Sequence, residues 1–84
     1  MIIPTIHNNG TSGSILLQQV LDSKHALQEA VKALCQAAPN GRDYYPQGPD
    51  AFRQAQAEHI SRYNRLVGVE AELEALAIAI SDLS

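Results

Sequence analysis

The stretch that decides the fold is PNGRDYYPQGPD, residues 39–50, which separates two long segments with helical periodicity. Pro39 cannot continue a helix, and Asn40-Gly41 is a dipeptide suited to the positive φ values of a chain reversal. We therefore expect the chain to fold back on itself here. A turn does not require the arginine and the two adjacent tyrosines that this stretch also contains, so it is a candidate binding loop as well.

The segment before this loop predicts a helix over residues 12–38. Thr11 or Ser12, within NNGTSGS, can serve as its N-cap, because a hydroxyl oxygen accepts a hydrogen bond from the free amides of a first turn. Residues at alternating spacings of three and four form its apolar seam, and Lys24 fills one position among Leu17, Val20, Leu27, Val31, Leu34 and Ala38.

The segment after the loop predicts a second helix over residues 50–83, opened by Gly48, Pro49 and Asp50. Gly68 lies inside this helix at a cost of roughly 1 kcal/mol relative to alanine, unless close packing requires it. The seam repeats at helical spacing and includes two cationic positions: Phe52, Ala55, His59, Arg62, Leu66, Val69, Leu73, Leu76, Ile80 and Leu83.

These segments predict an all-α fold, an antiparallel two-helix hairpin forming one domain, 1–84, with an extended N-terminal arm (1–11) and a connecting loop (39–49). At about 1.5 Å per residue the second helix is longer than the first, so we expect it to overhang at its end, LAIAISDL (76–83). That end is apolar nearly all round. We expect Ile2, Ile3 and Ile6 of the arm to cover it together with another subunit, which makes the protein a homo-oligomer.

Composition excludes several classes of protein. A net charge of −3 argues against binding to DNA or RNA polymers. A single cysteine, Cys35, is typical of a protein in a reducing compartment. The opening MIIPTI is too short and too uncharged for a signal peptide. No apolar run reaches the ~18 residues that a membrane span needs. We expect a cytoplasmic protein with no membrane partner.

The sequence has no residue pattern that predicts a catalytic site or a metal site. His7, His25, His59 and Cys35 lack the spacing of metal ligands, and no nucleophile is paired with a base. We therefore expect no metal, no cofactor and no enzymatic activity.

Charge is distributed unevenly along the chain. Residues 42–65 carry a net charge of +1, whereas the remaining residues carry −4. Arginines early in the second helix oppose the helix macrodipole. His59 and Arg62 fall on the apolar seam, and the register of a tight hairpin places them level with Lys24–Leu27. Such cations either bind an anion (a carboxylate such as Glu58 or Asp22, or a ligand phosphate) or extend past the seam to water.

Two segments are candidates for ligand binding. HNNGTSGS (7–14) combines hydroxyls and free amides at a helix start, which suits phosphate, although an N-cap alone also explains it. In the loop, an arginine fork suits phosphate and tyrosine faces suit a nucleobase, although a self-packed loop with Arg42 paired to Asp43 or Asp50 is the alternative. Together with nearby cations, the candidate ligand-binding residues are His7, Asn9, Thr11, Ser12, Arg42, Tyr44, Tyr45, Arg53, His59 and Arg62.

The two segments lie at opposite ends of the first helix, about 40 Å apart, so one chain cannot build a pocket from both. If neighbouring chains pack antiparallel, the arm of one meets the arginine–tyrosine loop of the other, and a symmetric oligomer repeats that pocket.

IHNNGTS followed by PNGRDYYPQG resembles a family of small proteins encoded by phages and prophages, and the resemblance covers most of the chain. Residues 40–48 are its most specific part. The chain departs from the family pattern at Ser14, where an acidic residue is common. In size and architecture the chain is also similar to phage sponges that counter CBASS and Thoeris immunity, which implies binding of cyclic oligonucleotides or cyclic ADP-ribose-type messengers without cleavage.

The leading prediction is a non-catalytic protein that sequesters a small phosphate-bearing nucleotide in the host cytoplasm. The alternative is a protein–protein interaction module that docks LAIAISDL or the loop on a host or virion protein. A third possibility is a scaffolding subunit whose assembly is its whole function.

Overall fold

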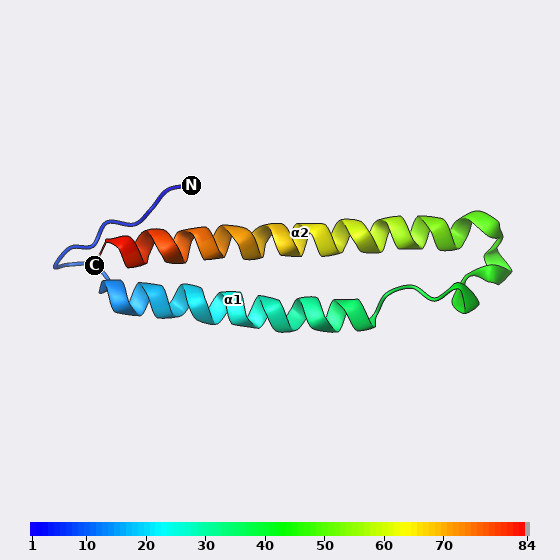
Figure 1. Ribbon diagram of the computed structural model, residues 1–84, viewed down its shortest axis with the longest axis horizontal. Coiled ribbons are helices and arrows are strands. Elements are labelled where there is room, and N and C mark those ends of the chain that lie inside the picture. Colours follow the sequence, from blue (N-terminus) through cyan, green and yellow to red (C-terminus); the bar gives the residue numbers. More distant parts are fainter. Residues whose placement is uncertain (84) are drawn as a thin grey trace.

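The structure is a computed structural model that describes residues 1–83. Helix α1 spans Gly13–Gln36 and helix α2 spans Pro49–Asp82, and two short 3-10 turns, η1 (Gly41–Asp43) and η2 (Tyr45–Gln47), lie between them. Figure 1 shows the helices side by side and antiparallel in a rod of 62 × 20 × 18 Å, with no strand among the described residues. The predicted all-α hairpin is therefore confirmed.

Helix α1 begins at a side-chain cap. The Oγ atom of Ser12 accepts a hydrogen bond from the backbone amide of Ile15 at 3.3 Å, so Ser12 rather than Thr11 is the N-cap. This bond satisfies one of the amides that the first turn leaves without a helical partner.

The chain reversal does not use the residues predicted for it. Gly48, with φ 105°, is the only residue within 1–83 that has a positive φ, so the prediction that Asn40-Gly41 supplies such values is wrong. Asn40 is instead extended, with φ −111°, and its side chain accepts a hydrogen bond from the Arg42 amide at 3.0 Å. The reversal is spread over η1 and η2, and only its last step, directly before Pro49, requires glycine.

Two side-chain contacts set the register of the helices. Gln28 Nε2 donates a hydrogen bond to Glu70 Oε1 at 3.0 Å, and Lys24 Nζ lies 3.7 Å from Glu74 Oε1. The prediction that His59 and Arg62 lie level with Lys24–Leu27 is therefore wrong by several turns. The connection over residues 37–48 runs along the first turns of α2 before it reverses, which moves the paired part of α2 toward its C-terminus.

This register also changes which end of α2 extends beyond its partner. Figure 1 shows that the N-terminal turns of α2 project past α1 and lie beside the loop. The predicted C-terminal overhang is therefore wrong, because LAIAISDL lies beside the first half of α1 (Figure 1), where Leu17, Leu21 and Ala77 line one hollow. Ala77, 6% exposed, and Ile80, 2% exposed, are the only buried side chains among residues 1–83.

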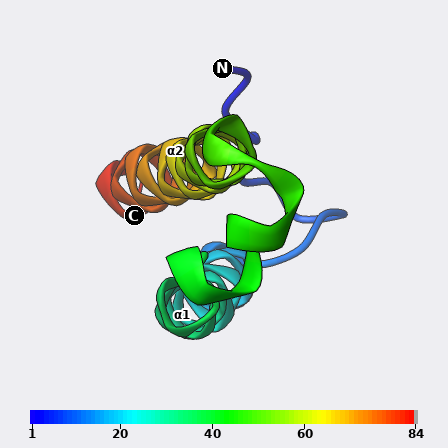
Figure 2. The ribbon, with the colours of Figure 1, turned by 90° about the vertical axis from the view of Figure 1, so that its right-hand side faces the viewer.

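The arm runs back beside the C-terminal turns of α2, as Figures 1 and 2 show. Ile3 and Pro4 are half-buried, whereas Ile2 is 95% exposed. The Ile6 side chain lies over Gly13, since a Cβ atom there would be 3.6 Å from Ile6 Cδ1. Ile3 and Ile6 therefore hold the arm to the hairpin, and Ile2 does not.

Candidate functional site

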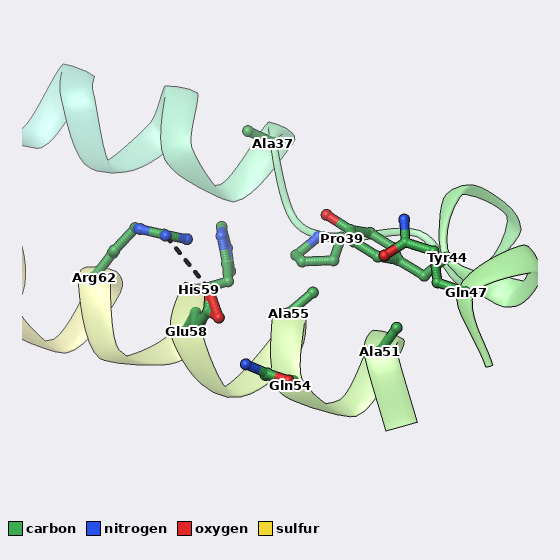
Figure 3. Close-up of a pocket in the computed structure, with 10 residues that line it drawn as sticks. All are labelled: Ala37, Pro39, Tyr44, Gln47, Ala51, Gln54, Ala55, Glu58, His59 and Arg62. Carbon is green, nitrogen blue, oxygen red and sulfur yellow. Dashed lines mark ion pairs between the residues drawn. The ribbon is translucent and has the colours of Figure 1, made fainter. Parts of the chain in front are cut away.

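The loop and the first turns of α2 enclose a groove of about 380 Å³, shown in Figure 3. The α2 residues in it recur every three or four positions, so they share one face of the helix. Two of them, Ala51 and Ala55, are small and leave room. The groove is lined by Ala37, Pro39, Tyr44, Gln47, Ala51, Gln54, Ala55, Glu58, His59 and Arg62.

Tyr44 forms the aromatic wall of the groove. Its ring centroid lies 6.3 Å from that of Phe52, with a tilt of 34°, and Figure 3 shows it extending back toward Pro39. Two backbone hydrogen bonds hold it: the Tyr44 amide donates to the Gly41 carbonyl at 3.1 Å, and the Gln47 amide donates to the Tyr44 carbonyl at 2.9 Å. The ring is therefore positioned by both short turns before any ligand is bound.

The other end of the groove is charged. Figure 3 shows His59 and Arg62 projecting from α2 toward the end of α1. Arg62 Nη2 lies 3.7 Å from Glu58 Oε2, and both side chains are about half exposed, at 54% and 52%. Exposed ion pairs of this kind contribute only about 0–1 kcal/mol, so an anionic ligand can compete with Glu58 for the guanidinium.

Three predicted residues lie at this end of the molecule but outside the groove. Arg42 Nε donates a hydrogen bond to Asn40 Oδ1 at 3.2 Å, so Arg42 is held by Asn40 rather than by Asp43 or Asp50. Arg53 forms an exposed ion pair with Asp50, and Tyr45 is 77% exposed. Of the two adjacent tyrosines, only Tyr44 faces the groove.

The remaining predicted residues lie at the opposite end: His7, Asn9 and Thr11 belong to the arm, and Ser12 is the N-cap of α1. The 24 residues of α1, about 36 Å of helix, separate them from the groove. The Gly10 amide donates to the His7 carbonyl at 3.1 Å, and the imidazole lies so close that a Cβ atom at Gly10 would be 2.8 Å from His7 Nε2. Within one chain, the arm and the groove are separate sites.

Pro39, Gln47 and Gln54 line the groove but are not among the predicted site residues. Helical spacing in the sequence places Gln54 on the same side of α2 as Glu58. No local pattern in the sequence, however, predicts which face of α2 the loop covers. Within residues 1–83, no cluster of three histidine, cysteine, aspartate or glutamate side chains has the arrangement of a metal site. Across the same residues, neither helix combines the length and apolar character that a membrane crossing needs.

Comparison of the chain with protein-family models, with curated proteins and with solved structures found no match. The geometry and chemistry of the groove are therefore the basis for a functional proposal.

Proposed function

We propose that this is a non-catalytic binding protein that sequesters a small phosphate-bearing nucleotide. One observation carries the proposal: a single groove has an aromatic wall, Tyr44, at one end and two nitrogen-bearing side chains, His59 and Arg62, at the other. Its volume of about 380 Å³ lies within the range of roughly 300–1,000 Å³ that is usual for small-molecule pockets.

Each aromatic or polar residue that lines the groove has a role in this proposal. A nucleobase stacks on the ring of Tyr44, since aromatic faces suit flat π systems. The planar fork of Arg62 exchanges Glu58 for a phosphate, and His59 donates a further hydrogen bond. Gln47 and Gln54 carry amides that both donate and accept, which suits the edge of a base.

The lining residues support binding rather than covalent chemistry. None of those that the structure describes around the groove is a serine, threonine, cysteine or lysine, and the one carboxylate among them, Glu58, is paired with Arg62. The similarity in size and architecture to phage sponges directs the ligand class to cyclic oligonucleotides or cyclic ADP-ribose-type messengers, held in the cytoplasm of a bacterial host. In this proposal the arm of a neighbouring chain, with Asn9, Thr11 and Ser12, completes the pocket.

The test is isothermal titration of the full chain at about 100 μM with a panel of cyclic dinucleotides, cyclic trinucleotides and cyclic ADP-ribose isomers. Tyr44→Leu and Arg62→Gln are expected to reduce affinity at least tenfold. Tyr45→Leu and Arg53→Gln are matched controls outside the groove and are expected to retain binding. The proposal fails if no member of the panel releases or absorbs heat, or if each control loses as much affinity as its partner variant.

A second candidate function is docking on a host or virion protein, and one observation favours it. Arg42 in η1 and Tyr45 in η2, the latter 77% exposed, are exposed residues of the loop outside the groove, and these residue types dominate binding energy at protein interfaces. In this case one stoichiometric partner is recovered with the wild-type chain and lost with Tyr45→Ala, while the groove variant Tyr44→Leu still recovers it.

A further inference from the structure

The hairpin exposes more surface than a folded chain of its mass should. Its accessible area is 6143 Å², whereas a monomeric protein of 9.1 kDa exposes about 4,900 Å². The excess, about 1,200 Å², exceeds the roughly 800 Å² that each partner contributes to a standard protein–protein interface. Among residues 1–83 only Ala77 and Ile80 are buried, and such a core falls short of what chains of this size need for stability.

One side of the hairpin is shaped to receive a partner. In Figure 2, which looks along the rod, the loop and the bend of the arm lie on the same side of the two helices, and the arm then continues over α2 to the N-terminus; Figure 1 places arm and loop at opposite ends. Arm and loop therefore bracket the middle of that side, where the two helices are uncovered.

The uncovered middle is an apolar groove. A hollow of about 260 Å³ is lined by Leu34, Arg62, Arg65 and Leu66, and it shares Arg62 with the groove under the loop. Two helical turns beyond Arg62 lies Val69, which is 44% exposed, and this spacing keeps it on the same side. By the same spacing, half-buried Leu27 continues the α1 wall from Leu34.

We propose that this face, centred on Val69 and lined by Leu27, Leu34, Leu66 and the stem of Arg65, docks a second copy of the chain in antiparallel orientation. The excess surface matches the area that such an interface needs, and a two-fold axis near Val69 gives each copy the same contacts.

Charge favours the antiparallel arrangement. Arg65 lies in the N-terminal half of α2, which carries all the arginines of this helix. Glu72 lies two turns later on the same side of α2, in the C-terminal half, which has no lysine or arginine. A two-fold axis near Val69 brings Arg65 of one copy close to Glu72 of the other. Parallel docking would instead oppose like charges.

The arrangement has a consequence for the binding site. Because the axis exchanges the two ends of the rod, the arm of each copy, with Thr11 and Ser12, reaches the loop end of the other. Two composite pockets then form, one at each end. This consequence rests on the proposed function for its ligand, but the docking itself does not.

The decisive test is light scattering of the full chain at about 100 μM without ligand, with two variants of matched chemistry. Val69→Glu places a charge on the docking face, whereas Ile60→Glu places one on an exposed residue, 57% accessible, that lies nine positions away and thus on the opposite side of α2. Circular dichroism verifies that both variants stay helical.

We expect the wild-type chain and Ile60→Glu to have at least twice the 9.1 kDa mass of one chain, and Val69→Glu to dissociate at least tenfold more readily. Reversal of one charge, Arg65→Glu or Glu72→Arg, should also weaken association, and the double variant should restore it. The inference is overturned if the wild-type chain is a monomer, or if Ile60→Glu weakens association as much as Val69→Glu does. It is also overturned if the double variant associates no more strongly than either single variant.

A cross-linking experiment tests the juxtaposition of arm and loop. In a Cys35→Ala background, chains carrying Thr11→Cys are mixed with chains carrying Gln47→Cys and treated with a bis-maleimide. We expect the mixture to give a higher yield of cross-linked pairs than either variant gives alone. If the mixture and the single variants give equal yields, the antiparallel arrangement is overturned. Dimers that cross-link in this way but bind no nucleotide refute the proposed function and leave the docking face intact.

Discussion

Gly48 is the residue on which the geometry of the loop depends most directly. Its φ of 105° and ψ of 168° fall in a region that is essentially restricted to glycine. Nothing lies within 4 Å of a Cβ atom built at Gly48, so the cost of a side chain there is conformational rather than a clash with neighbours. Gly48→Ala is therefore expected to destabilise the fold by about 1–3 kcal/mol, or to rearrange the loop.

Gly41→Ala is the matched control, because Gly41 belongs to the same loop and has no positive φ. A Cβ atom there would lie 3.8 Å from Phe52 Cδ2, an ordinary contact distance. We expect this variant to be neutral or more stable by about 0.4–1 kcal/mol, since alanine restricts the unfolded chain.

Thermal melts followed by circular dichroism, at one fixed protein concentration, measure the difference. For a chain of this size each kcal/mol corresponds to about 4–8 °C in Tm, so a loss of about 1–3 kcal/mol should make Gly48→Ala melt about 4–24 °C below the wild type. Because Gly48 directly follows Gln47, the variant should also weaken any ligand bound in the groove. Equal melting temperatures for the two glycine variants would refute the assignment of strain to Gly48.

Two further predictions concern the helices. Ile80→Ala removes a side chain that is only 2% exposed, and it is expected to lower the free energy of unfolding in urea by about 2–5 kcal/mol. Ile78→Ala, at a position 57% exposed, should change that free energy by less than about 0.5 kcal/mol. Similar losses for both variants would mean that the core is elsewhere. Ser12→Ala removes the cap of α1 and should cost about 0.5–1 kcal/mol in the same assay, while Ser14→Ala, which leaves the Ser12–Ile15 bond in place, should not destabilise the helix.

Much of the fold follows from local signals in the sequence. Spacings of three and four predict both helices, and Ser12 and Pro39 mark the start of the first and the break after it. Tyr44, His59 and Arg62 stand out by residue type, and the structure places these three in one groove. The sequence predicts the overhang at the wrong end of α2, because helix lengths indicate which helix is longer but not which part of it lies beside the shorter one.

Which tyrosine faces the groove had no signal in the sequence either. Tyr44 and Tyr45 are adjacent and chemically identical, and only the two 3-10 turns turn one ring toward Phe52 and leave the other 77% exposed. Arg42 has the chemistry of a phosphate ligand, yet its hydrogen bond to Asn40 holds it outside the groove.

The amino-acid sequence by itself determined that this chain forms two helices joined by a loop, because periodicity, caps and helix breakers act over a few neighbouring residues. Only the tertiary structure decided that residue 28 lies level with residue 70, that LAIAISDL lies beside α1, and that the loop and the bend of the arm lie on one side. Those features depend on the path of residues 37–48 between the helices, and that path involves contacts such as Tyr44 with Phe52, eight residues apart, which neither helical periodicity nor a cap or breaker residue predicts.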